Sequence, residues 1–226
     1  MKYTTLLFDA DDTLLDFSKA ERSALKSTFS KHEIPVSDEL LKKFSEVNLG
    51  LWKLFEQEKI EKADIIKRRF ADTLAFFNIP YSPDIGLEAD YQALLSRQYF
   101  LVDHAEEVAK ELSKTHDMYI ITNGLLKTQK NRFENCGILP YFKGYFVSEA
   151  VGHQKPAKEY FDYVFNAAGC DSSNTLIIGD SCSSDINGAI LSGTDSCWFN
   201  PKNLPMTALK EPTYEIKDLR ELIKIV

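Results

Sequence analysis

The sequence has few of the features that mark membrane, secreted or nucleic-acid-binding proteins. No stretch approaches the roughly 20 apolar residues that a membrane helix needs, and the opening residues Met1-Lys2-Tyr3 show no signal-peptide pattern. Basic residues are outnumbered, 27 against 34 acidic ones, and the net charge of −7 argues against a nucleic acid polymer as partner. We therefore expect a cytoplasmic protein with no membrane partner.

Cysteine is also sparse, and the sequence lacks internal repeats and low-complexity segments. The four cysteines do not show the paired spacing of a structural metal site, so we expect reduced thiols at Cys136, Cys170, Cys182 and Cys197. What remains, 44% hydrophobic and 27% charged residues in a chain of 226, is typical of a globular protein. That length accommodates one ordinary domain and a smaller insert.

Residues 6–13 combine an apolar run with three carboxylates. Leu6-Leu7-Phe8 shows no polar alternation, as in a parallel strand that is covered on both faces. Asp9, Asp11 and Asp12 then repel one another within four positions. A divalent cation would hold them together, and such hard oxygen ligands suit magnesium. An acidic turn after a strand is the alternative.

Residues 17–100 show a helical pattern without a convincing strand. We expect four helices, the first closed by Ile34-Pro35, the second starting near Ser37, the third over 64–77 and the fourth over 83–100. Aromatic residues are expected in the core of this unit: Trp52, Phe55, Phe70, Phe76 and Phe77. The pattern predicts an all-helical domain at 17–100, inserted into a core formed by 1–16 and 101–226.

Strands and helices alternate beyond Asp103. The predicted strands are 118–121, 145–147, 176–178 and 196–199, with a last edge strand at 213–216. The predicted helices are 105–114, 125–136, 157–168 and 186–191, with a short closing helix at 218–226. This alternation predicts an α/β fold with a doubly wound, Rossmann-like parallel sheet, whose strands all end at one edge.

Polar residues follow the predicted strands directly, where open parallel sheets bind their ligands. They are Asp9, Asp11 and Thr13 after the first strand, Thr122-Asn123-Gly124 after the second, Lys155-Pro156 beyond the third, and Asp180 with Asp185 after the fourth. Two acidic clusters, a hydroxyl and a lysine at one edge are together more specific than any one of them.

Phosphoryl transfer gives each of these groups a task. Magnesium held by Asp9 and Asp180, supported by Asp185, would neutralise most of the phosphate charge that a carboxylate nucleophile must approach. Lys155 would supply the remaining positive charge. The hydroxyl of Thr122 and the amides of Asn123 and Gly124 would bind the phosphate oxygens. Asp11 would protonate the leaving oxygen and then take a proton from the attacking water.

These residues resemble the four ordered motifs of the haloacid dehalogenase superfamily of phosphatases. The resemblance rests on Asp9-Ala10-Asp11-Asp12-Thr13, Thr122, Lys155 and Asp180 with Asp185. It implies that Asp9 is the nucleophile of an aspartyl-phosphate mechanism and Asp11 the general acid and base. It further implies a magnesium ion on the Asp9 carboxylate, the Asp11 main-chain carbonyl and Asp180, and a mobile cap in the helical insert.

One departure narrows the resemblance. Most members carry glycine after the second aspartate, where this chain has Asp12, and aspartate tolerates left-handed backbone better than most residues. The string from Phe8 to Phe17, Thr122-Asn123-Gly124, and Ser148-Glu149-Ala150-Val151-Gly152 ahead of Lys155-Pro156 look like the bacterial pyrimidine 5′-nucleotidase branch. The implied substrate is a small phosphate monoester such as a nucleoside 5′-monophosphate, cleaved by a monomer or weak homodimer.

Plainer interpretations stand beside these. Lys155 could be a solvated lysine at a helix start, and Thr122 and Asp185 could cap the helices that follow them. His153 and Cys182 are interpreted as bystanders, while Phe17, beside the nucleophile, is the aromatic candidate for substrate contact. Rival functions are a sugar-phosphate phosphatase, a phosphosugar mutase, a dehalogenase, a phosphoreceiver-type signalling domain and an inactive binding module. Asp11 and Asp180 argue against the dehalogenase, and the helical insert argues against the receiver.

Overall fold

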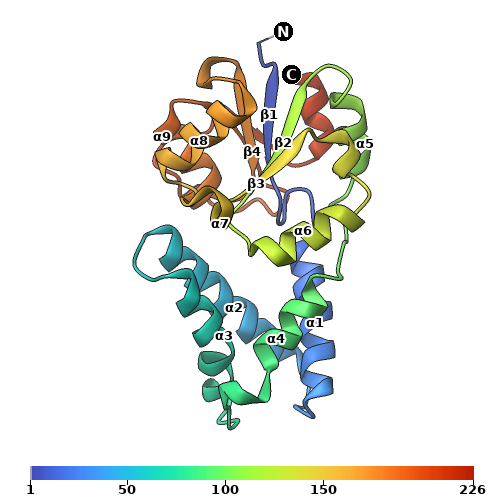
Figure 1. The fold of residues 1–226 in the computed structure, drawn as a ribbon, viewed down its shortest axis with the longest axis vertical. Helices are drawn as coiled ribbons and strands as arrows, with labels where there is room; N and C mark the ends of the chain where they lie inside the picture. Colours follow the sequence, from blue (N-terminus) through green and yellow to red (C-terminus); the bar gives the residue numbers. More distant parts are fainter. Residues whose placement is uncertain (1) are drawn as a thin grey trace. The chain divides into compact units, whose positions relative to one another are not determined.

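The computed structural model describes residues 2–226, in which six strands form one parallel sheet in the order β3-β2-β1-β4-β5-β6 (Figure 1). The strands are β1 (Thr5–Asp9), β2 (Asp117–Thr122), β3 (Gly144–Val147), β4 (Thr175–Gly179), β5 (Asp195–Phe199) and β6 (Tyr214–Ile216). The predicted α/β fold with a doubly wound sheet is confirmed. Strand order reverses between β1 and β4, the position at which such sheets bind ligands.

Helices cover both faces of the sheet. They are α5 (Ala105–Leu112), α6 (Leu126–Asn135), α7 (Ser148–Val151), α8 (Lys158–Ala168) and α9 (Asn187–Ser192). Leu6 and Phe8 of β1 belong to the core shared with α5 and α6, whereas Leu7 packs in the core with α8 and α9. Alternate residues of β1 thus point to opposite apolar layers, which explains its continuous hydrophobic sequence.

The chain divides into two compact units, Met1–Phe17 with Tyr99–Val226, and Ser18–Gln98. The second unit is helical, formed by most of α1 (Phe17–Lys31) together with α2 (Asp38–Glu56), α3 (Lys62–Phe76) and α4 (Leu87–Leu95). Its centre is a buried aromatic cluster with ring centroids 4.8–5.9 Å apart, formed by Phe29, Phe44, Phe70 and Tyr91. The Ser37 side chain caps α2 by accepting from the Leu40 amide, which confirms the predicted start of this helix.

Two expectations for this unit are wrong. The helix predicted over 83–100 is divided, because Gly86 adopts a left-handed φ of 79° between a short 3₁₀ turn and α4, which ends at Leu95. Phe76 was assigned to the core but is 62% exposed, with the Lys43 Nζ 4.2 Å from its ring centroid. At the end of α3 its side chain lies outside the apolar stripe that Phe70 and Leu74 occupy.

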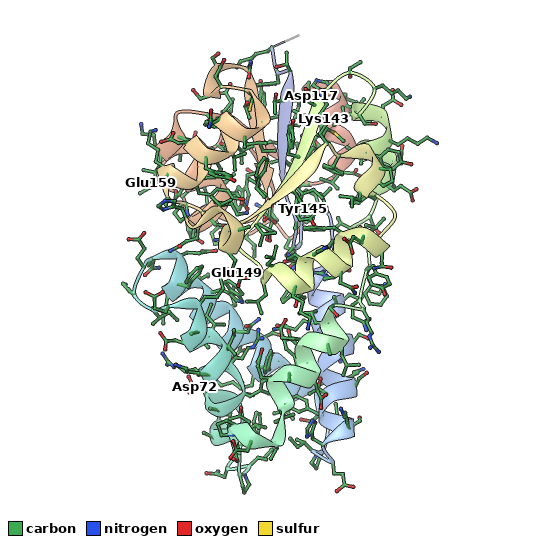
Figure 2. All side chains as sticks on the ribbon, viewed as in Figure 1. Asp72, Asp117, Lys143, Tyr145, Glu149 and Glu159 are labelled. Carbon is green, nitrogen blue, oxygen red and sulfur yellow. The ribbon has the colours of Figure 1, made fainter. Side chains whose placement is uncertain are left out.

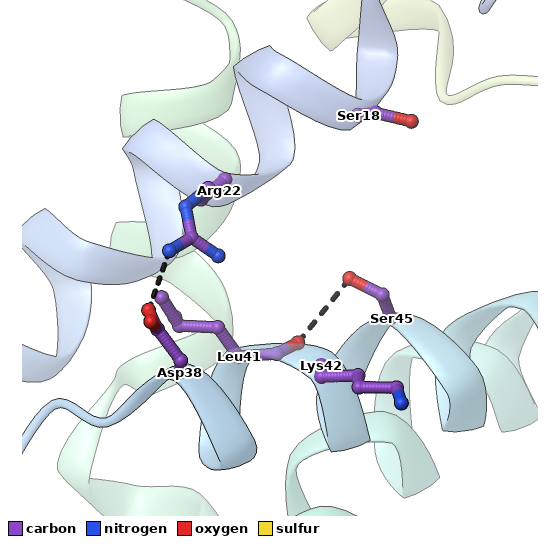
Figure 3. Close-up of a pocket in the computed structure, with 6 residues that line it drawn as sticks. All are labelled: Ser18, Arg22, Asp38, Leu41, Lys42 and Ser45. Atoms are coloured by element: carbon purple, nitrogen blue, oxygen red, sulfur yellow. Dashed lines mark hydrogen bonds and ion pairs between the residues drawn. The ribbon is translucent and has the colours of Figure 1, made fainter.

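A pocket of about 470 Å³ lies between α1 and α2 within the helical unit (Figure 3). Arg22 and Asp38 form an ion pair of 2.5 Å at one side of it, and Ser18 and Ser45 lie on the other. Ser45 also donates to the carboxylate of the buried Glu21. Among residues 2–226, no helix has the length and hydropathy needed to cross a membrane.

Candidate active site

The neighbouring strands β1 and β4 bring distant carboxylates to one edge of the sheet. Asp9 is the last residue of β1, Asp180 follows β4 directly, and Asp185 lies in the π-helical turn Cys182–Ile186. One carboxylate oxygen from each of Asp9, Asp180 and Asp185 lies within 4.8 Å of the other two. This is the convergence of the two acidic motifs that the sequence predicted.

Lys155 joins two carboxylates of this cluster. Its Nζ donates to Asp9 Oδ1 and to Asp185 Oδ1, each at 2.6 Å, and only 2% of its side chain is exposed. The Asn123 side chain fixes the lysine backbone, since it accepts from the Lys155 amide at 2.9 Å and donates to the Lys155 carbonyl at 2.8 Å. A solvated helix-start lysine is thereby excluded.

The cluster holds more negative charge than one lysine balances. Burial raises the pKa of Asp9 to about 8, despite the opposing influence of Lys155, and Asp185 adds to the rise. The pKa of Asp180 is raised well above its usual range, by burial first and then by Asp9. Burial lowers the pKa of Lys155, but Asp185 and Asp9 outweigh that effect and raise it. A divalent cation would restore the balance, and this set of hard oxygen donors fits magnesium.

Asp185 and Thr122 do not cap helices, contrary to the plainer interpretations. Ser181 caps the turn that holds Asp185, whereas Asp185 accepts from the Ser181 amide at 3.1 Å. Thr122 ends β2, and its Oγ1 accepts from the Gly124 amide and from Gln129 Nε2, both at 3.0 Å. Because that oxygen accepts both bonds, its own hydrogen is left to donate to a ligand.

Two glycines leave space for these side chains. A Cβ at Gly179 would overlap the Asp185 carboxylate, and one at Gly124 would lie 2.6–2.9 Å from three atoms of the Gln129 side chain. A larger residue at either position would displace a polar group of the site. Glycine is needed here for close approach.

Asp12 lies in the left-handed region, with a φ of 58°, as its place in the motif led us to expect. Its carboxylate is 3.9 Å from Lys202 Nζ. Asp12 also contributes to the raised pKa of Asp180, behind burial, Asp9 and Asp185. The substitution of glycine by aspartate therefore preserves the backbone turn and adds negative charge near the cluster.

The Asp11 carboxylate is held by two residues that the sequence analysis did not select. Arg132 Nη1 donates to Asp11 Oδ1 at 2.5 Å, and Gln129 Nε2 donates to Asp11 Oδ2 at 2.7 Å. Both come from α6, where the surrounding sequence is polar and resembles a solvent-exposed helix. Three crowded aspartates repel one another and need positive charge nearby, and this need is the one sequence signal that points to a residue such as Arg132.

The remaining candidates lie around this centre. The half-buried Phe17 packs with its ring centroid 5.9 Å from the Arg132 guanidinium carbon. Cys182 is buried against Ile186 and Trp198, and His153 is exposed in a loop, so neither joins the acidic cluster. Trp198 of β5 donates its indole N–H to the Asp180 carbonyl at 2.8 Å and thereby anchors the turn that carries Asp180.

Comparisons with known proteins identify the family of this chain. A model of the haloacid dehalogenase-like hydrolase family matches residues 3–193. HAD-hydrolase YfnB of Bacillus subtilis is 42% identical over all of this chain and 96% of its own length. Pyrimidine 5′-nucleotidase PynA of Streptococcus pneumoniae is 32% identical over 99% of this chain and 94% of its own. Pyrimidine 5′-nucleotidase YjjG of Escherichia coli is 30% identical over 100% of this chain and 99% of its own length.

A solved structure extends the comparison. The crystal structure of YfnB from Bacillus subtilis bound to magnesium superposes with a TM-score of 0.94 at 41% identity, covering 100% of this chain and 99% of that one. A 2-haloacid dehalogenase from Pseudomonas syringae shares the fold at 23% identity, with a TM-score of 0.67.

Proposed function

The chain belongs to the haloacid dehalogenase-like hydrolase family, and on that premise we propose that it is a magnesium-dependent phosphatase of nucleoside 5′-monophosphates. The observation that carries the chemistry is the buried contact of Lys155 with Asp9 inside a cluster of carboxylates. The substrate class rests on the two pyrimidine 5′-nucleotidases at 30–32% identity.

In the proposed reaction, a carboxylate oxygen of Asp9 attacks phosphorus, the ester P–O bond breaks, and an aspartyl-phosphate forms. Lys155 neutralises charge on the transferring phosphoryl oxygens. Asp11 gives a proton to the leaving oxygen and later removes one from the water that cleaves the aspartyl-phosphate. The Asp9 carboxylate, the Asp11 main-chain carbonyl and Asp180, with Asp185 behind them, would hold magnesium, which would offset the phosphate charge.

We assign phosphate contact to the hydroxyl hydrogen of Thr122. The amides of Asn123 and Gly124 remain proposed phosphate contacts. In the structure, the Asn123 side chain also holds the Lys155 backbone, and the Gly124 amide donates to Thr122. Phe17 remains the aromatic candidate for substrate contact, next to Arg132.

We propose a catalytic core at 1–16 and 101–226 and a cap at 17–100 that sets substrate preference, a monomer or weak homodimer, and no nucleic acid polymer or membrane as partner. All four cysteines are free, which favours a reducing, cytoplasmic compartment. Light scattering on the purified protein tests the oligomeric state.

A phosphate-release screen tests the function. The purified enzyme is incubated with magnesium and with pyrimidine and purine nucleoside 5′-monophosphates, sugar phosphates and a haloacid. We expect the fastest phosphate release from pyrimidine 5′-monophosphates, its loss in excess chelator, and its recovery with magnesium. Preference for a sugar phosphate would replace the nucleotidase assignment, and isomer formation without phosphate release would indicate a mutase. Full hydrolysis in excess chelator would contradict the metal site.

A further inference from the structure

We propose that Gln129 and Arg132 are positioning residues for the Asp11 carboxylate, an inference that rests on the proposed phosphatase function. They lie three residues apart on α6, so their side chains leave the same face of the helix. Each is 1% exposed, whereas the Asp11 side chain is 29% exposed. The Asp11 carboxylate is therefore held by two buried side chains, while part of its surface stays exposed to solvent.

The three side chains form a closed ring of hydrogen bonds. Arg132 and Gln129 each donate to a different oxygen of Asp11, at 2.5 and 2.7 Å, and Arg132 Nη1 also donates to Gln129 Oε1 at 3.0 Å. With both oxygens bound by buried donors, rotation of the carboxylate is restricted. Such charge-assisted bonds are among the stronger hydrogen bonds in proteins.

The ring also reaches the phosphate side of the site. The same Gln129 nitrogen that donates to Asp11 donates to Thr122 Oγ1 at 3.0 Å. The loop before α6 is shaped around this side chain, because a Cβ at Gly124 would collide with it. One amide thus fixes the proposed acid and base relative to the proposed phosphate contact.

Fixing Asp11 matters because a general acid must lie within about 2.6–3.2 Å of the oxygen that it protonates. A displacement of about 1 Å can cost on the order of a hundredfold in rate. The requirement depends on the ester, since an acidic leaving group departs without a proton and an alkoxide does not. Loss of positioning should therefore harm esters of poor leaving groups selectively.

The test compares Gln129→Met and Arg132→Lys with the wild type on three esters: p-nitrophenyl phosphate, phenyl phosphate and a pyrimidine nucleoside 5′-monophosphate. The constant kcat/KM is measured, because it covers only the steps up to departure of the leaving group. We expect the loss in kcat/KM to grow in that order. The loss for the nucleotide should be at least about tenfold greater than the loss for p-nitrophenyl phosphate, because general acid catalysis contributes about 100- to 10,000-fold and only part of it depends on positioning. Lys130→Met, on the exposed side of α6, is the matched control and should leave every value unchanged.

A second arm uses the Asp11→Asn background, in which Gln129→Met and Arg132→Lys should have little further effect on nucleotide hydrolysis. Unfolding midpoints are recorded for each variant. Equal losses on all three esters, undiminished effects in the Asp11→Asn background, or faster nucleotide hydrolysis would each overturn the positioning role. A wild type that releases phosphate from none of the esters would instead defeat the proposed function.

Discussion

The two edges of the sheet carry lysine–aspartate pairs of equal length and opposite electrostatic character. At the amino edge, Lys2 Nζ lies 2.6 Å from Asp195, with 59% of the lysine side chain exposed, and this hydrogen bond lowers the pKa of Asp195. At the carboxyl edge, Lys155 Nζ lies 2.6 Å from Asp9, yet burial raises the pKa of Asp9 to about 8. The distance between the two charges therefore does not determine the protonation of the pair.

Burial and the local count of charges make the difference. A second exposed pair at the amino edge joins Asp117, at the start of β2, to Lys143, just before β3, again at 2.6 Å (Figure 2). Such pairs contribute little because water screens them. The carboxyl edge places one buried lysine beside the buried Asp9 and Asp185, with the half-buried Asp180 nearby, and unbalanced charge is costly in such a setting. Its surplus of negative charge is what a bound cation would offset, as proposed above.

The largest expected effect comes from the same substitution at each edge. We expect Asp9→Asn to reduce phosphate release at least about thousandfold, because the amide cannot serve as the nucleophile. Asp195→Asn should leave turnover unchanged. Both variants should remain folded by circular dichroism, and near-normal turnover in Asp9→Asn would show that another residue is the nucleophile.

Removing a lysine should destabilise the protein at the carboxyl edge and have little effect on stability at the amino edge. Lys155→Ala leaves the Asp9 and Asp185 carboxylates buried without the lysine ammonium group. We expect this to lower the free energy of unfolding, measured in urea without metal, by about 3–5 kcal/mol. It should also raise KM, because the phosphate loses a positive partner. Lys143→Ala is the matched control and should move neither quantity. Equal destabilisation by the two substitutions would contradict the contrast between the edges.

The smallest expected effect is a pH dependence of opposite sign at the two edges. The folded pKa of Asp9 lies above its usual value of 3.8, so the folded state binds the extra proton and metal-free stability falls as pH rises from about 4 to 8. The slope of stability against pH is set by the number of protons that the folded protein releases over this interval. The lowered pKa of Asp195 instead adds stability that is lost as pH falls below about 3.8.

Urea unfolding at pH 5 and pH 8.5, in chelator and in magnesium, measures this slope. We expect lower stability at pH 8.5 in chelator, and a flatter profile in magnesium or with Asp9→Asn, since each removes the repulsion. Metal-free stability that climbs across this interval would mean that Asp9 is already ionised at low pH.

The parallel core could be predicted because its strands are buried on both faces and therefore apolar throughout, as in Leu6-Leu7-Phe8. The short helix α7, Ser148–Val151, was missed because four residues cannot display a helical period. The break at Gly86 was missed because the apolar spacing on either side of it continues the helical pattern. Both features span too few residues to change the periodic pattern from which helices are predicted.

The acidic cluster could be predicted from one rule, that parallel strands end at the same edge. Asp9, Asp180 and Lys155 each follow a predicted strand or the loop after it, and the structure brings them together. Gln129 and Arg132 could not be found in this way, because they lie within a helix whose neighbours include Lys127, Lys130 and Asn131. Both are buried in the folded protein and donate to Asp11, and these tertiary contacts leave no local pattern in the sequence.

The position of β1 between β2 and β4 has a consequence for synthesis on the ribosome. The strand bearing Asp9 is the first to be made, yet its two partners are residues 117–122 and 175–179. The nascent chain must carry an unpaired apolar strand while all of the intervening helices are translated, a delay that favours chaperone capture. No incomplete chain that stops before residue 185 contains the full acidic cluster, so premature termination products should be catalytically silent.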